Sequence, residues 1–222
     1  MAEIIPSINM ASDLSEIEEK IRLVEGHVDW VHIDIVDGKF ATPSTWPYSL
    51  DGVELAPRLS DIHTKVNIEL HLMTQTPEDD LDEWLDTQAK RILIHYEASA
   101  DPRQALTLLS MSKIEEGLVL NMGTKVDVLS EHHDMLELIQ LMTIAHIGPS
   151  GIKFDENSLS KIRQVKQDYP KLSLQVDGGM NEQTIKKVLD AGADRIVVGS
   201  AIFKADNPLE ALTKLQKIAD NG

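Results

Sequence analysis

Residues 30–38 read Trp30-Val31-His32-Ile33-Asp34-Ile35-Val36-Asp37-Gly38, and no other segment is as informative about the fold. Side chains alternate between the two faces of a strand, so His32 and Asp34 point the same way, about 6–7 Å apart along the backbone. The intervening aliphatic residues are typical of a parallel strand that is covered on both faces. Because burying polar groups is costly unless they have partners, the stretch predicts a buried strand that presents two polar side chains to one spot.

Short apolar runs alternate with amphipathic segments along the whole chain. We expect strands at residues 3–8, 30–36, 66–72, 91–95, 117–121, 138–144, 172–176 and 195–198. We expect helices at residues 13–25, 77–87, 102–112, 157–167, 181–190 and 208–219, three of them preceded by capping residues at Ser12-Asp13, Thr76-Pro77 and Asn181.

Strand and helix repeat about every 25–30 residues, which favours a parallel sheet with helical crossovers. Eight such units suit a protein of the α/β class in which residues 1–222 form a single (β/α)8 TIM barrel domain. A doubly wound open sheet is the alternative, but no Gly-x-Gly-x-x-Gly follows the first strand.

The composition limits the classes of function. The chain has no cysteine, which excludes disulfides, thiolate metal sites and a cysteine nucleophile. Its formal net charge of −16 argues against nucleic acid as a partner, because phosphate backbones require a basic face. A single phosphate on a small ligand is still compatible, since a few backbone N–H groups and a helix N-terminus can hold it.

The N-terminal residues lack the basic stretch and apolar run of a signal peptide. No apolar stretch approaches the ~20 residues that a membrane span requires. We therefore expect a cytoplasmic protein without membrane contact.

Residues at the C-terminal ends of barrel strands meet at one mouth. His71 and Asp177 close predicted strands, as His32 and Asp34 do. Two imidazoles with two carboxylates suit zinc, manganese, iron(II) or cobalt better than magnesium or calcium. A lone histidine in a strand is more often a hydrogen-bonded core residue, but three strand ends that each present a ligand-type residue favour one shared divalent metal ion.

Asp34 and Asp177 lie on different strands and would approach the mouth from different sides. Two carboxylates that flank a substrate can remove a proton from one face and return one to the other, while the metal polarises a carbonyl group. The alternative for Asp177 is that it only opens the turn Asp177-Gly178-Gly179.

Glycines follow the last two strands, as Gly178-Gly179 and as Gly199-Ser200. Loops after strands 7 and 8 are the usual phosphate site of such barrels, although each pair alone is also typical of a plain turn. Met73 and Met142 at strand ends are either core or mouth residues. His95, in His95-Tyr96-Glu97, is either a rim residue or a capped strand end, and His146 also follows a strand.

Longer motifs occur in a fixed order: Pro6-Ser7-Ile8, His32-Ile33-Asp34-Ile35-Val36-Asp37-Gly38-Lys39-Phe40, His71-Leu72-Met73, His95-Tyr96-Glu97-Ala98, Leu141-Met142-Thr143, Val176-Asp177-Gly178-Gly179 and Gly199-Ser200-Ala201-Ile202-Phe203. In order and spacing the chain resembles the ribulose-phosphate 3-epimerase family over essentially its whole length. The resemblance implies a (β/α)8 barrel, one divalent metal ion held by His32, Asp34, His71 and Asp177, and Asp34 and Asp177 as the acid and base that invert C3 of a ketopentose phosphate. We expect the phosphorylated sugar to contact Ser7, His71, Met73, Met142, Gly148, Gly178, Gly179, Gly199 and Ser200.

Three departures from the family pattern concern the rim. Val36 replaces a methionine, Ala41-Thr42-Pro43-Ser44 replaces Val-Pro-Asn, and residues 146–152 replace the glycine-rich lid, with Pro149 where glycine would be free. The first expectation is interconversion of D-ribulose 5-phosphate and D-xylulose 5-phosphate. The departures keep two alternatives open, a 3-epimerase of another ketose phosphate such as allulose 6-phosphate, or a ligand-binding paralogue with little activity. Association into a homo-oligomer also stays open.

Overall fold

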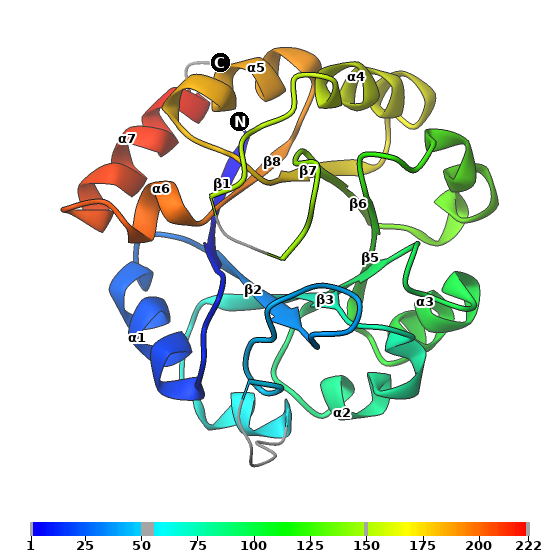
Figure 1. The fold of residues 1–222 in the computed structure, drawn as a ribbon, viewed down its shortest axis with the longest axis horizontal. Coiled ribbons are helices and arrows are strands. Elements are labelled where there is room, and N and C mark those ends of the chain that lie inside the picture. The colour runs from blue at the N-terminus through cyan, green and yellow to red at the C-terminus, as the bar shows by residue number, and fades with distance from the viewer. Residues whose placement is uncertain (1, 50–55, 149–150, 221–222) are drawn as a thin grey trace.

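The apolar runs form eight parallel strands that close into a barrel, with each strand beside its sequence neighbours and β1 beside β8 (Figure 1). This is a computed structural model, and it describes residues 2–49, 56–148 and 151–220. The strands are β1 (Glu3–Ile8), β2 (Trp30–Val36), β3 (Asn67–Met73), β4 (Arg91–His95), β5 (Glu115–Leu120), β6 (Leu138–Met142), β7 (Ser173–Asp177) and β8 (Arg195–Val198). The predicted fold class is confirmed. That all of residues 1–222 belong to one domain stays a prediction.

Helices surround the barrel (Figure 1). They are α1 (Leu14–Val24), α2 (Leu81–Leu85), α3 (Pro102–Met111), α4 (Ser158–Asp168), α5 (Glu182–Ala191), α6 (Ser200–Phe203) and α7 (Pro208–Asp220). Short 3-10 turns add η1 (Ala56–Asp61), η2 (Pro77–Asp79), η3 (Val126–Glu131) and η4 (His133–Met135). Among the described residues, no helix is long and apolar enough to cross a membrane.

The expected N-caps explain where two of the helices begin. The Asp13 carboxylate accepts the backbone N–H of Glu16 at 2.9 Å, and Asn181 and Thr184 form a reciprocal capping box at the start of α5. The helix predicted at residues 77–87 is wrong in extent, because the segment divides into η2 and the five-residue α2. Its start is poorly capped, since Thr76 is left-handed with φ 48° and makes no side-chain cap bond.

The inside of the barrel holds a polar network. Glu69 and Gln175 are fully buried and Arg91 is 2% exposed. The Glu69 carboxylate accepts bonds of 2.6 Å from both Arg91 Nη1 and Gln175 Nε2. At the N-terminal end of the barrel the guanidinium groups of Arg91 and Arg195 stack on Trp30, 4.0 and 5.3 Å from the ring centroid. This packing closes that end and leaves the C-terminal ends of the strands as the mouth.

Candidate metal centre and catalytic pocket

Four side chains that can bind a metal converge at the mouth. His32, Asp34, His71 and Asp177 each offer a ligand atom, and these atoms all lie within 4.8 Å of one another. The strand register accounts for the convergence, because Asp34 on β2 lies directly beside His71 on β3. His71 Nδ1 is 2.9 Å from Asp34 Oδ1 and 3.7 Å from Asp177 Oδ2. The sequence prediction that these four residues meet agrees with this geometry.

Glu69 fixes the ring of His32 from below. Its Oε1 is 2.6 Å from His32 Nδ1, so this nitrogen donates and the other, Nε2, faces Asp34 Oδ1 at 3.1 Å. A carboxylate on the far nitrogen of a ligating histidine sets its tautomer and orientation. The sequence analysis missed Glu69, yet the signal was present, since a charged residue two positions before His71 points to the same face of a buried strand.

The electrostatics of the two aspartates differ. Burial raises the pKa of Asp34, but the neighbouring imidazoles of His32 and His71 outweigh it and hold that pKa well below its usual range. Burial, followed by the charge of Asp34, raises the pKa of Asp177 to about 7. Burial also lowers the pKa of His71 to about 4. The hydrogen bond to Asp34 raises this pKa, but by less than burial lowers it.

The donor set therefore suits a divalent cation. The carboxylates of Asp34 and Asp177 approach one point and repel each other, which adds to the effect of burial in raising the pKa of Asp177. A cation between them would replace this repulsion with attraction. Imidazole and carboxylate donors are those that zinc and similar transition metals accept.

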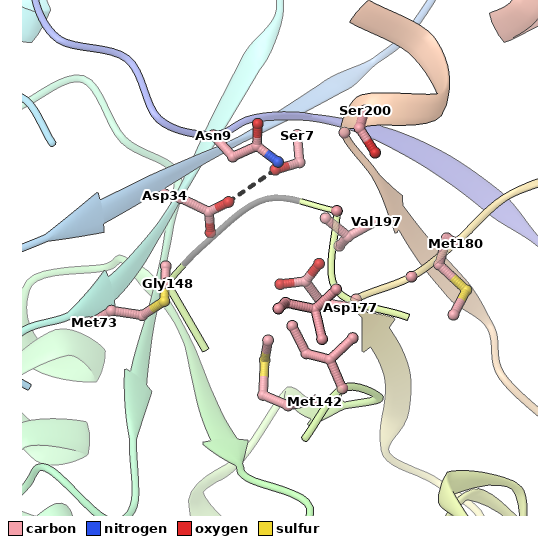
Figure 2. Close-up of a pocket in the computed structure, with 16 residues that line it drawn as sticks. Ser7, Asn9, Asp34, Met73, Met142, Gly148, Asp177, Met180, Val197 and Ser200 are labelled. Atoms are coloured by element: carbon pink, nitrogen blue, oxygen red, sulfur yellow. Dashed lines mark hydrogen bonds between the residues drawn. The ribbon is translucent and has the colours of Figure 1, made fainter. Parts of the chain in front are cut away.

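A pocket lies above these residues at the mouth of the barrel (Figure 2). Asp34 lies beside Ser7 on one side, and Asp177 lies across from them (Figure 2). Ser7 Oγ donates to Asp34 Oδ2 at 3.0 Å. Of the residues expected at the substrate, the lining includes Ser7, Met73, Met142, Gly148, Gly178, Gly179, Gly199 and Ser200. His71, like His32, does not line the pocket and has no exposed surface.

The lining also includes residues that the sequence analysis did not select, namely Asn9, Ile144, Gly151, Ile152, Met180 and Val197. Asn9 continues the inward alternation of Ser7, so strand periodicity could have found it. Neither His146 nor His95 is part of the lining, since His146 is exposed and His95 is buried. Pro149 and Ser150, part of the altered lid, lie outside the described residues.

Two glycines at the rim of the pocket, Gly148 and Gly179, each allow another segment of the backbone to come close. A Cβ on Gly148, at φ 108°, would lie 2.3 Å from the carbonyl oxygen of Thr42. The two loops that depart from the family pattern therefore touch each other. A Cβ on Gly179, at φ 70°, would lie 2.5 Å from the backbone nitrogen of Phe154, so glycine is required there as well.

A family model described as the ribulose-phosphate 3 epimerase family matches residues 3–203. The chain belongs to this family. The cytoplasmic isoform of ribulose-phosphate 3-epimerase from Oryza sativa subsp. japonica is 34% identical over 221 residues, covering 97% of this chain and 93% of the rice protein. The ribulose-phosphate 3-epimerase of Bacillus subtilis is 30% identical over 223 residues, covering 97% and 99%. The family resemblance inferred from the motifs is confirmed, and the protein is an isomerase of the carbohydrate epimerase class.

More distant solved structures share the fold. The 3-hexulose-6-phosphate synthase of Salmonella typhimurium aligns with a TM-score of 0.73 at 14% identity, covering 99% of both chains. The orotidine 5'-phosphate decarboxylase of Pyrococcus horikoshii aligns with a TM-score of 0.68 at 16% identity and covers 98% of this chain and 99% of its own. The epimerase relatives do not favour the two alternatives, another ketose phosphate or a paralogue with little activity.

Proposed function

We propose that this family member interconverts D-ribulose 5-phosphate and D-xylulose 5-phosphate by inverting the configuration at C3. The observation that carries the proposal is a pair of aspartates on facing sides of one pocket, the buried Asp34 and the partly buried Asp177, beside two buried histidines. Inversion at C3 requires one group that removes the proton from one face and a second group that delivers a proton to the opposite face of the planar intermediate.

The proposed reaction has two proton transfers. One aspartate takes the C3 proton, and the electron pair of the C–H bond moves toward the C2 carbonyl to give an enediolate. The other aspartate then delivers a proton to the opposite face of C3. The direction of the reaction sets which aspartate acts first. When bound at His32, Asp34, His71 and Asp177, a divalent cation would supply Lewis-acid polarisation of the carbonyl group.

Other lining residues hold the substrate in place. Ser7 donates to Asp34 and fixes the orientation of that carboxylate. The side chains of Met73 and Met142, both 3% exposed, give the planar intermediate an apolar, polarisable wall that excludes water. Gly178, Gly179, Gly199 and Ser200 line the side of the pocket after β7 and β8, where we place the phosphate against backbone N–H groups.

The mixed imidazole and carboxylate set favours one ion of zinc, iron(II), manganese or cobalt. The absence of a nucleic-acid partner and a cytoplasmic location stay predictions, and association into a homo-oligomer stays open.

Proton exchange at C3 tests the proposal. Metal-loaded protein is incubated with D-ribulose 5-phosphate in D2O, and loss of the C3–H signal and formation of product are followed by NMR. We expect exchange and xylulose 5-phosphate from the parent protein and from Asp190→Asn, a matched change at an exposed position of α5. We expect neither from Asp177→Asn. Equal exchange by Asp177→Asn and the parent, or no exchange by metal-loaded parent, would overturn the proposal.

A further inference from the structure

The imidazole of His95 is fully buried, lies outside the pocket lining and contacts a proposed metal ligand. Its Nε2 is 2.9 Å from His71 Nε2, and the two rings stack with centroids 5.0 Å apart and an interplanar angle of 26°. On its other side, His95 Nδ1 is 3.1 Å from Glu97 Oε2. The three side chains thus form a continuous hydrogen-bonded chain that ends at His71.

The chemistry of the three groups sets the direction of these bonds. An ionised carboxylate only accepts, so His95 Nδ1 carries a proton and donates to Glu97. An imidazole with one proton then has a lone pair on Nε2, which accepts from His71 Nε2–H. With its Nε2–H donated to His95, His71 has Nδ1, 2.9 Å from Asp34 and 3.7 Å from Asp177, as the nitrogen that would bind a metal ion. This is the tautomer in which His71 can bind a metal.

Glu97 is itself held in place on its other oxygen. Its Oε1 accepts the backbone N–H of Asn121 at 2.8 Å and the hydroxyl of Thr124. The carbonyl of Asn121 accepts Lys161 Nζ at 2.5 Å, and this lysine is 9% exposed. Oε2 is therefore the oxygen that faces His95, and the carboxylate cannot rotate without breaking the bonds from the loop after β5.

We propose that His95 and Glu97 are positioning residues that fix the metal-binding tautomer and ring orientation of His71. The inference rests on the proposed metal site and names residues outside the ligand set. Each ligand histidine would then be oriented by a carboxylate. Glu69 contacts His32 directly, and Glu97 acts on His71 through His95.

Glu97→Gln tests the direction of the chain with almost no change in shape. The amide oxygen retains the bonds to Asn121 and Thr124, so the NH2 group takes the place of Oε2 and donates to His95 Nδ1. His95 must then donate from Nε2, and His71 must carry its proton on Nδ1, toward the metal. We expect Zn2+ affinity, measured by competition with a chromophoric chelator, to fall about 10- to 100-fold.

Three further variants separate this effect from general damage. Glu116→Gln removes one buried carboxylate from β5 away from the histidines, and we expect parental Zn2+ affinity. His95→Gln can accept from His71 and donate to Glu97, so its affinity should lie closer to the parent than that of His95→Leu. Equal Zn2+ affinity in Glu97→Gln and Glu116→Gln would overturn the inference.

A measurement on the unaltered protein requires no variant to fold. In the Zn2+-loaded state, nitrogen-15 NMR of the histidine rings should place the proton of His71 on Nε2 and that of His95 on Nδ1. The opposite placement would overturn the inference. A protein with this tautomer pattern that fails to exchange the C3 proton would overturn the proposed reaction alone, and a parent protein without Zn2+ affinity would overturn both.

Discussion

Replacing Glu69 with alanine should cost the barrel a large part of its stability. The buried carboxylate accepts three bonds of 2.6 Å, from His32 Nδ1, Arg91 Nη1 and Gln175 Nε2. Its removal leaves Arg91, which is 2% exposed, with the carboxylate of Glu115 at 2.7 Å as its remaining ion-pair partner. Removing one partner of a buried ion pair costs about 3–5 kcal/mol.

For a domain of this size, each kcal/mol lowers Tm by roughly 2–4 °C, so we expect Glu69→Ala to lose about 6–20 °C. The assay is thermal unfolding followed by circular dichroism, with chelator in every sample so that metal binding does not contribute. Glu115→Ala is the matched control, because that side chain pairs with the same arginine but is 34% exposed. Its cost should be about 1 kcal/mol or less. Equal losses in the two variants would refute the assignment of Glu69 as the central anion of the interior.

Three further predictions concern the metal, the rim and a buried lysine. Chelation should abolish turnover, and adding Zn2+ at 100 times its Kd should raise the free energy of unfolding by about 2.7 kcal/mol, measured as a thermal shift. Gly179→Ala should raise KM at least about tenfold, since its Cβ would displace the Phe154 backbone, whereas Gly26→Ala, at φ 84° in open space, should leave KM unchanged. Burial lowers the pKa of Lys161 to about 8, against 10.5 for an ordinary lysine. Between pH 8 and 10.5 the unfolded chain binds more protons than the folded protein. The free energy of unfolding of the parent relative to Lys161→Met should therefore rise with pH, by at most about 1.4 kcal/mol per pH unit. A difference between the two proteins that stays constant from pH 8 to pH 10 in urea unfolding would contradict this.

The strands and the four-residue cluster could be predicted because both follow from strand periodicity. Every predicted strand agrees with the structure to within two residues at each end. Once eight parallel strands close into a barrel, polar side chains that point inward near the C-terminal ends of the strands must share one mouth. His32, Asp34, His71 and Asp177 satisfy both conditions, so their identity needed no knowledge of side-chain packing.

The interior network could not be predicted in the same way, since it depends on contacts across strands. That His95 reaches His71 follows from how two rings on adjacent strands stack, and Glu97 is aimed by a loop after β5. The helix expected at residues 77–87 was too long, because the spacing of apolar residues was its main support. That spacing does not reveal the left-handed backbone of Thr76 or the repulsion among the closely spaced acidic residues that follow it, and both oppose a longer helix.

The contact between Gly148 and Thr42 bears on how this protein can change during evolution. The loops after β2 and β6 meet at the rim of the pocket. Glu69, by contrast, bonds both to the proposed metal ligand His32 and to Arg91 in the barrel interior, so the metal site and the stability of the barrel depend on the same side chain. A mutation at Glu69 or its partners should therefore reduce both metal binding and folding stability. Mutations in the two loops should mainly affect whether the loops still pack against each other. Selection for a new sugar would therefore act first on these loops together, and a loop transplanted from a relative should function only when its counterpart is transplanted with it.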